Sequence, residues 1–385
     1  MAVRIGINGV GRIGRNLWRI IHTSAPDIEI AMVNDTAELA AVANLLRHDS
    51  VRGRFPADVD QVRRPGGEAL VVAGAVVPIR HQPVPDQVPW GDYGVDLVVE
   101  STGQFARGQA ARGHLSGGAR RVVISTASPD ADVSLMMGVN EHDFDPDQHQ
   151  VVSNSCCTTY CLATMIHALR PRYEVSRGSA TIAYSNGSRP GPLLDEAFGD
   201  ARGPGRRAGT NLRMSRANAI SIVPANVPGV RHALDRVLPE LAGQISATAM
   251  RVPVRATSAA TLLLRTTHPA EPDDVNATLE AAAASLLKGY LEVSRDPLVS
   301  SDLIGSAASC VVDAGLTTTL GDLVRVVGWY DNEWGYANRL VDLIRFLARP
   351  AASCPGVTAP AGSPGQGGAP PAEPDAAGAP PAPGG

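Results

Sequence analysis

Three cysteines lie close together in the middle of the chain, at Cys156, Cys157 and Cys161. They follow a short strand-like run, Val151–Val152, and begin a stretch that is typical of a helix. A cysteine at a helix N-terminus has its thiolate stabilised by the helix dipole, and the thiolate is the form that attacks electrophiles. The position therefore indicates a nucleophilic cysteine. Three small buried side chains that merely pack a helix would give the same pattern.

The same cysteines give no sign of a metal site or of a disulfide framework. The chain has five cysteines in 385 residues, no CxxC motif, and no histidine at a spacing typical of zinc ligands. Its first residues form a strand pattern rather than a signal peptide, and no apolar run is long enough to span a membrane. We therefore expect a cytoplasmic protein without a bound metal.

A glycine-rich motif near the N-terminus has the spacing G-x-G-x-x-G, at Gly9, Gly11 and Gly14. It lies between a strand-like run that ends at Ile7 and a helix-like run that begins at Arg15. In that context the first glycine permits a tight turn, the second lets a pyrophosphate approach the backbone, and the third allows close packing of helix on strand. The motif predicts a dinucleotide site at the helix N-terminus.

One acidic residue strengthens this interpretation. Asp35 stands 21 residues after Gly14, at the end of the next strand-like run. Its carboxylate could there accept hydrogen bonds from the ribose hydroxyls of NAD, and it disfavours the 2′-phosphate of NADP. A glycine-rich turn that binds nothing is the alternative explanation.

The elements around these motifs fall into two groups. Strand-like and helix-like runs alternate over the first hundred residues, which favours parallel β-α-β units. From about residue 151, longer strand-like runs are separated by helices such as Asp273–Leu287, which favours a mostly antiparallel sheet. The expected fold class is α/β, with a Rossmann-type doubly wound nucleotide-binding domain in residues 1–155 and an α+β catalytic domain in residues 156–331.

Composition sets further limits. A hydrophobic content of 44% with 19% charged residues excludes global disorder, and a net charge of −4 makes nucleic-acid binding unlikely on electrostatic grounds. Residues 189–210 are rich in Gly, Pro and Arg and predict a long loop. In residues 351–385, 27 of 35 residues are Ala, Pro or Gly, so we expect a disordered tail.

Beyond the glycine and cysteine motifs, the sequence resembles the phosphorylating glyceraldehyde-3-phosphate dehydrogenase family over residues 2–349. The motifs that carry the resemblance are, in chain order, Gly6–Arg15, Val33–Asp35, His48–Phe55, Pro89–Gly91, Glu100–Gly103, Gly138–Asn140, Ser153–Ala163, Arg251–Pro253, Pro297–Asp302 and Trp329–Arg339.

The resemblance implies a role for the cysteine. Cys157 would attack an aldehyde, and the resulting hemithioacetal would give a hydride to nicotinamide and leave a thioester. Ser125 and Asn332 match positions that hold the nicotinamide end of NAD.

The resemblance also covers the cofactor loop and the assembly. Arg12 and Ile13 match the cofactor-binding loop, together with Asp35 on the neighbouring strand. Because the sequence Asn-Asp-Thr at this strand also occurs in members that accept both cofactors, NADP stays open. The final helix, at about residues 332–349, is expected to complete the nucleotide-binding domain, and the protein is expected to form a homotetramer.

The sequence departs from the family where the proton acceptor stands. The family pattern His-Ala-Tyr-Thr appears here as Ile182-Ala183-Tyr184-Ser185, so we expect isoleucine in the place of the general-base histidine. Isoleucine cannot accept a proton.

The expected substrate-binding positions are altered as well. By resemblance they are Cys156, Thr158, Ser185, Gly229 and Arg251. Cys156 replaces a serine, Gly187 an acid, Pro228 a threonine and Met214 the second of two arginines. We therefore expect an NAD-dependent oxidation of an aldehyde, or the reverse acyl reduction, on an altered small-molecule substrate. The alternative is a catalytically weak NAD-binding paralogue that acts as a binding or regulatory protein.

Overall fold

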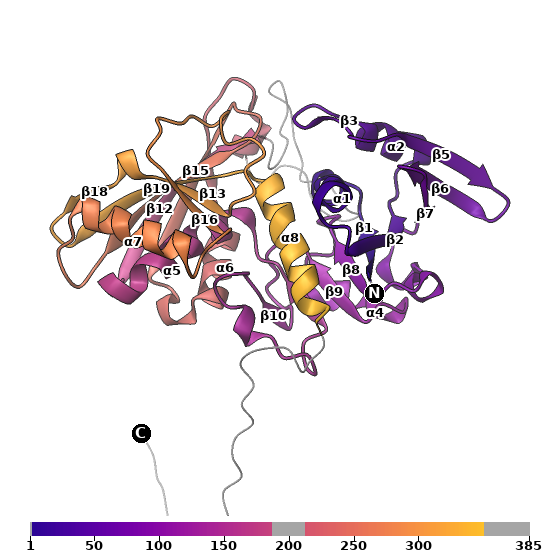
Figure 1. The fold of residues 1–385 in the computed structure, drawn as a ribbon, viewed down its shortest axis with the longest axis horizontal. Helices are drawn as coiled ribbons and strands as arrows, with labels where there is room; N and C mark the ends of the chain where they lie inside the picture. Colours follow the sequence, from indigo (N-terminus) through magenta and orange to yellow (C-terminus); the bar gives the residue numbers. More distant parts are fainter. Residues whose placement is uncertain (1, 187–211, 350–385) are drawn as a thin grey trace, which may run out of the picture.

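The computed structural model describes residues 2–186 and 212–349. The predicted loop 189–210, the position Gly187 and the predicted tail 351–385 lie outside the described residues. Two sheets, each with its own helices, lie side by side in Figure 1, and helix α8 runs between them.

The first sheet belongs to the N-terminal half. Its strands are β1 (Val3–Asn8), β2 (Ile28–Asn34), β5 (Val59–Arg64), β6 (Gly67–Val72), β7 (Ala75–Arg80), β8 (Leu97–Glu100), β9 (Arg121–Ile124), β10 (Val133–Ser134) and β11 (Val151–Ser153), and β3 (His48–Asp49) pairs with β4 (Gly53–Arg54) apart from it. Its helices are α1 (Arg12–Ser24), α2 (Leu39–Arg47), α3 (Gly108–Ala111) and α4 (Gly113–Ser116), with single turns η1 (Pro85–Gln87), η2 (Trp90–Tyr93) and η3 (Glu141–Asp143).

The strand order predicts a crevice at the carboxyl ends of the central strands of this sheet. The order is β10-β11-β9-β8-β1-β2-β7-β6-β5, and the strands from β10 to β7 are mutually parallel. Strand β1 lies between β2 and β8, so the chain leaves the centre of the sheet in both directions. Such a switch point opens a crevice outside the carboxyl ends of the strands, where α/β sheets bind ligands.

The second sheet is mixed. Its strands are β12 (Arg177–Ser185), β13 (Val223–Asn226), β14 (Ile245–Val252), β15 (Ser258–Arg265), β16 (Leu291–Ser294), β17 (Cys310–Asp313), β18 (Thr318–Leu320) and β19 (Leu323–Tyr330). The helices are α5 (Cys157–Tyr173), α6 (Pro228–Val237), α7 (Pro272–Ala284) and α8 (Trp334–Leu347), with single turns η5 (Leu212–Ser215), η6 (Pro239–Leu241) and η7 (Ala314–Leu316).

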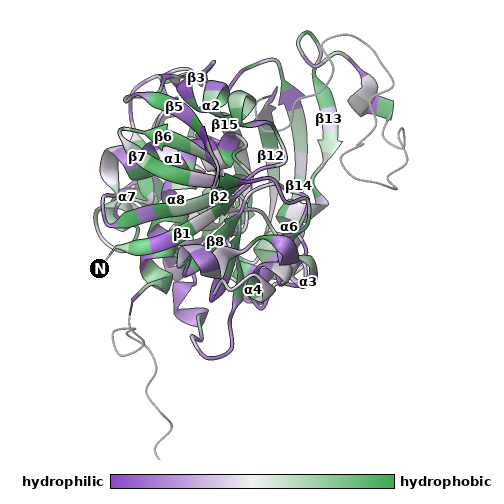
Figure 2. Cartoon of the chain, turned by 90° about the vertical axis from the view of Figure 1, so that its right-hand side faces the viewer, coloured by the Kyte–Doolittle hydropathy of each residue, from purple (hydrophilic) through white to green (hydrophobic). Residues whose placement is uncertain are grey.

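One face of the second sheet is packed and the other is more open. Helices α5, α6 and α7 pack on the sheet, and α5 contacts its central strands β15 and β19. On the other face, side chains of the register-paired strands β12, β14 and β15 are more exposed, among them Ser179, Ser246 and Leu263. Figure 2 shows that β12, β13 and β14 carry both hydrophobic and hydrophilic residues along their lengths.

The predicted α/β fold class, with a mostly parallel first sheet and a largely antiparallel second sheet, is confirmed.

Helix α8 joins the two halves of the molecule. It packs on α1, and Arg345 near its end forms an ion pair with Asp27 at 2.6 Å. Just before α8, the buried Asp331 accepts two hydrogen bonds from Arg52, at 2.6 and 2.7 Å. These contacts fix the residues between β19 and α8 against the first sheet. Within residues 2–186 and 212–349, no helix has the length and apolarity needed to cross a membrane.

Candidate active site

The glycine motif forms the turn between β1 and α1. Gly9 has a φ of +93°, and a Cβ there would lie 2.8 Å from the backbone nitrogen of Thr102. A Cβ on Gly14 would lie 2.3 Å from the carbonyl oxygen of Gly9. A Cβ on Gly11 would meet nothing closer than the Ser101 carbonyl oxygen at 3.9 Å, so this backbone faces open space. The first and third glycines therefore make the turn, and the second leaves room for a ligand.

Asp35 lies beside this turn and accepts a hydrogen bond from its backbone. Its Oδ2 accepts a hydrogen bond from the Val10 amide at 2.7 Å, and its Oδ1 accepts one from the Ala37 amide at 2.9 Å. A carboxylate has about four acceptor positions, so two remain for ligand hydroxyls. The backbone contacts hold the carboxylate beside the glycine turn, as a ribose-binding acid requires.

Two adjoining cavities lie between Asp35 and Cys157, and together they are called the groove. The first, of about 170 Å³, contains Asp35 and Gly9, and the second, of about 310 Å³, contains Cys157. They share Gly11, Ser101 and Thr102. The second cavity is lined by Gly11, Arg12, Ile13, Ser101, Thr102, Gly103, Ser125, Thr126, Cys156, Cys157, Tyr184, Asn332, Glu333 and Tyr336. Asp35 and the backbone at Gly11 are the groups in these cavities that would hold the ribose and pyrophosphate of a dinucleotide.

Cys157 is the first residue of α5, as the sequence predicted, and Cys156 is its N-cap. Burial, the neighbouring Cys156 and the carboxylate of Glu333 raise the pKa of Cys157 to about 12, which the hydrogen bonds with Thr158 only partly oppose. No cation is among these groups. The thiol is therefore protonated at neutral pH in this structure, although the helix N-terminus favours its thiolate.

Asn332 lies beside the sulfur and is held by two serines. Its Nδ2 is 3.9 Å from the Sγ of Cys157, and its Oδ1 accepts hydrogen bonds from Ser185 and Ser258, both at 3.0 Å. Because both serines donate to Oδ1, the amide nitrogen must point to the thiol and the cavity. Ser185 is buried and does not line the cavity, so in this structure it positions Asn332 rather than facing a substrate.

The residue of β12 that faces the thiol is Tyr184. Its hydroxyl forms a hydrogen bond with the hydroxyl of Thr158. Tyr184 lines the cavity together with Cys157, and the nearby thiol helps to raise the pKa of Tyr184. Ile182 lies two residues earlier on the same strand, is fully buried and does not line the cavity. Isoleucine offers no proton acceptor at this position, and its correspondence to the general-base histidine of the family stays a prediction. Alternation along a strand places 182 and 184 on the same face, and 184 is the one that reaches the sulfur.

Three more of the predicted substrate-binding residues, Thr158, Gly229 and Arg251, are not among the residues that line the cavity. Thr158 is buried, and its hydroxyl is shared by Tyr184 and by Tyr330, whose oxygen is 2.8 Å away. Gly229 lies in the first turn of α6 and is not among the residues that line the cavity. Arg251 is paired in register with Tyr184 on the adjacent strand β14. The structure thus brings Cys156, Cys157, Ser125 and Asn332 together with Arg12 and Ile13, and it adds Tyr184, Tyr330 and Glu333.

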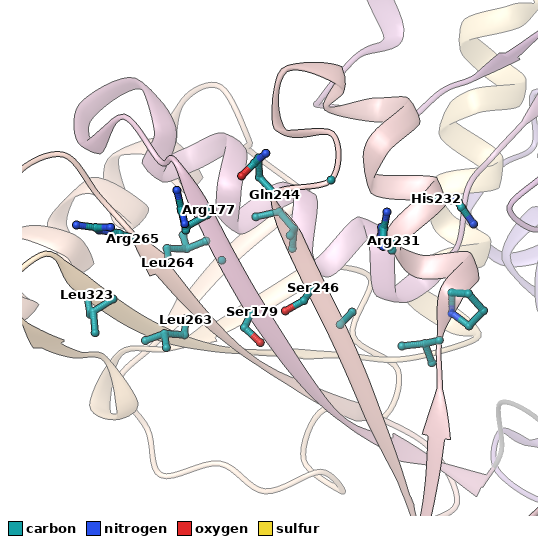
Figure 3. Close-up of a pocket in the computed structure, with 16 residues that line it drawn as sticks. Arg177, Ser179, Arg231, His232, Gln244, Ser246, Leu263, Leu264, Arg265 and Leu323 are labelled. Carbon is teal, nitrogen blue, oxygen red and sulfur yellow. The ribbon is translucent and has the colours of Figure 1, made fainter.

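Another cavity, of about 740 Å³, lies along the second sheet, where β12, β14 and β15 meet helix α6 (Figure 3). Arg177, Arg231 and Arg265 project from different elements around it, and Ser179 and Ser246 line its floor (Figure 3). Arg265 forms an ion pair with Asp322 at 2.7 Å. No cysteine lines this cavity, so it offers no counterpart to the thiol chemistry of Cys157.

Comparison with known proteins agrees with the groove. Residues 3–108 match the family described as glyceraldehyde 3-phosphate dehydrogenase, NAD binding domain, and residues 156–332 match its C-terminal domain. The chain is 42% identical to a glyceraldehyde-3-phosphate dehydrogenase of Geobacillus stearothermophilus over 351 residues, 90% of this chain and 99% of that protein. It is 40% identical to glyceraldehyde-3-phosphate dehydrogenase 2 of Streptomyces avermitilis over 350 residues, with the same two coverages. The chain belongs to the glyceraldehyde-3-phosphate dehydrogenase family, and it is an NAD-binding oxidoreductase of that family.

Proposed function

We propose that this protein oxidises an aldehyde with NAD, or reduces the corresponding acyl group, through a covalent bond to Cys157. The two adjoining cavities of the groove, one at Asp35 and one at the thiol, are the observation that carries the proposal. Nicotinamide bound at the Cys157 end would accept or supply the hydride. The thiol would hold the substrate, first as a hemithioacetal and then as a thioester. Asn332, oriented by its two serine donors, would direct its amide nitrogen to that end of the groove.

The names of the relatives make glyceraldehyde 3-phosphate the first substrate to test, but the described site favours a less charged aldehyde. Among the described residues that line the cavity at Cys157, Arg12 is the only cation, and it pairs with Glu333 at 3.1 Å. A phosphate dianion is usually held by several charge-assisted hydrogen bonds. Ser185 and Thr158 do not supply them, because both hydroxyls are engaged inside the protein. We therefore propose an altered substrate.

We propose NAD rather than NADP as the working cofactor. The carboxylate of Asp35 sits where the adenosine ribose would lie, and a phosphate there would face a negative charge.

We also propose a homotetramer and a cytoplasmic location. The open face of the second sheet exposes Met250 and Leu263 between polar residues, which suits a contact with another copy of the chain. Five cysteines in 385 residues are too few for the disulfide framework of a secreted protein, which supports a cytoplasmic location.

Calorimetry combined with absorbance assays tests the proposed reaction. NAD should bind to the wild-type protein and to the Cys157→Ser variant alike, because the cofactor loop lies apart from the thiol. Aldehyde-dependent formation of NADH should occur only with the wild-type protein, and uncharged aldehydes should compete well with glyceraldehyde 3-phosphate. NAD binding without any aldehyde oxidation would favour the alternative, a binding or regulatory paralogue.

A further inference from the structure

The environment of Cys157 poses a chemical problem. A thiol adds to an aldehyde when its sulfur attacks the carbonyl carbon and its proton reaches the carbonyl oxygen. A histidine base usually separates these events by forming the thiolate first. The groups that face Cys157 here are Cys156 and Cys161 at α5, Tyr184 from β12, Tyr330 from β19, and Asn332 and Glu333 before α8. None of these described residues carries a positive charge, and the guanidinium of Arg12, which lines the same cavity, pairs with Glu333.

Three hydroxyls from three elements lie together beside this sulfur. The oxygen of Thr158, on α5, forms hydrogen bonds with Tyr184 from β12 and with Tyr330 from β19. Thr158 directly follows Cys157 in α5, and Tyr184 lines the same cavity as Cys157. Thr158 and Tyr330 are at most 1% exposed, whereas the ring of Tyr184 lines the cavity that a substrate would enter.

Burial keeps both phenols neutral. It raises the pKa of Tyr184 and of Tyr330 well above the ordinary value, and the nearby thiols act in the same direction. A neutral hydroxyl is at once a donor and an acceptor, so a chain of hydroxyls can pass a proton along without forming a charge. Tyrosinate, in contrast, is not available here as a base at neutral pH.

We propose that Tyr184, with Thr158 and Tyr330 behind it, is the proton-transfer group for Cys157 and that addition proceeds from the neutral thiol. The Sγ–C bond forms as the carbonyl π bond opens. Tyr184 gives its hydroxyl proton to the carbonyl oxygen and takes the thiol proton, directly or through Thr158. The hydroxyl cluster is unchanged at the end, and the product is a neutral hemithioacetal. This inference rests on the proposed role of Cys157, but it concerns a step that needs no cofactor.

The test compares two reactions of the same sulfur. Addition of ¹³C-labelled propanal, followed by NMR line broadening without NAD, requires a proton on the carbonyl oxygen. Alkylation by iodoacetamide requires none. Tyr184→Phe should slow propanal exchange by about 10²-fold, the usual scale for a general acid, and change alkylation less than threefold. Tyr173→Phe is the matched control, because that buried phenol at the far end of α5 has no hydrogen-bond partner among the described residues.

A second variant excludes a merely structural effect. Tyr184→His would place an imidazole next to the sulfur and create a thiolate–imidazolium pair. Alkylation at pH 7 should then rise at least tenfold and acquire an inflection in the range where histidine titrates. The proposal is overturned if Tyr184→Phe leaves propanal exchange unchanged while the wild-type adduct forms. The absence of any wild-type adduct would instead refute the role of Cys157 itself.

Discussion

Alkylation of Cys157 should be slow and steeply dependent on pH. With a pKa of about 12 instead of the ordinary 9.0, the thiolate fraction at pH 7 falls about a thousandfold. A more basic thiolate is a better nucleophile, with a Brønsted slope of about 0.4–0.5, so each thiolate reacts roughly 15-fold to 30-fold faster. The net expectation is alkylation about 30-fold to 60-fold slower than that of an ordinary cysteine.

The assay is the rate of iodoacetamide labelling at Cys157, followed by mass spectrometry of its peptide between pH 6 and pH 10. The same chain unfolded in urea provides the reference rate for an unperturbed thiol. We expect the rate in the folded protein to rise about tenfold per pH unit through this whole range, because only the thiolate reacts. A plateau that begins below pH 8 would show a stabilised thiolate and would refute the assignment of a neutral thiol without a cationic partner.

Ionisation of Cys157 makes the stability of the folded protein fall as the pH rises. An acid whose pKa is lowered by a partner in the folded state has the opposite effect. Because burial raises the pKa of the Cys157 thiol, the folded protein holds its proton between about pH 9 and pH 12 while the unfolded chain releases it. The contribution to stability is complete below about pH 9 and decreases as the pH rises through this window.

Four further substitutions test other parts of the site. Asp35→Asn should weaken NAD binding about 10-fold to 100-fold, since charge-assisted hydrogen bonds are worth roughly 1.5–3 kcal/mol. It should weaken NADP binding less. Equal losses of NAD and NADP affinity in calorimetry would contradict the assignment of the ribose site. Gly14→Ala should abolish NAD binding and lower the melting temperature, because the new Cβ would lie 2.3 Å from the Gly9 carbonyl oxygen, whereas Gly11→Ala should keep the melting temperature and lose affinity alone. Ser258→Ala should lower kcat but leave the NAD dissociation constant within about twofold, since it frees the Asn332 amide to rotate; an unchanged kcat would show that the serine does not orient the amide.

Much of the cofactor half could be predicted from the sequence because its geometry is local. Gly9 and Gly14 are needed by one turn, and Asp35 by the end of the next strand, so residue type and spacing suffice. The start of α5 at Cys157 was predictable for the same reason.

The substrate half depends on contacts between distant segments. A short motif suggested Ile182 as the altered proton-transfer position, but only pairing of β12 with its neighbours shows which residue reaches the sulfur. Thr158 and Ser185 have suitable hydroxyls for a ligand, yet Tyr330 and Asn332 engage them from more than a hundred residues away. Alternation along β12, counted back from its end, was the one local signal that could have pointed to Tyr184.

The central claim is that Cys157 holds an acyl intermediate while NAD is reduced at the end of the groove. Intact mass spectrometry after a single turnover, with absorbance of NADH recorded on the same sample, tests it most directly. We expect an acyl adduct on the Cys157 peptide and one NADH for each adduct, with neither product in Cys157→Ser. NADH formed by Cys157→Ser at the wild-type rate, or an adduct located on Cys156 instead, would contradict the account.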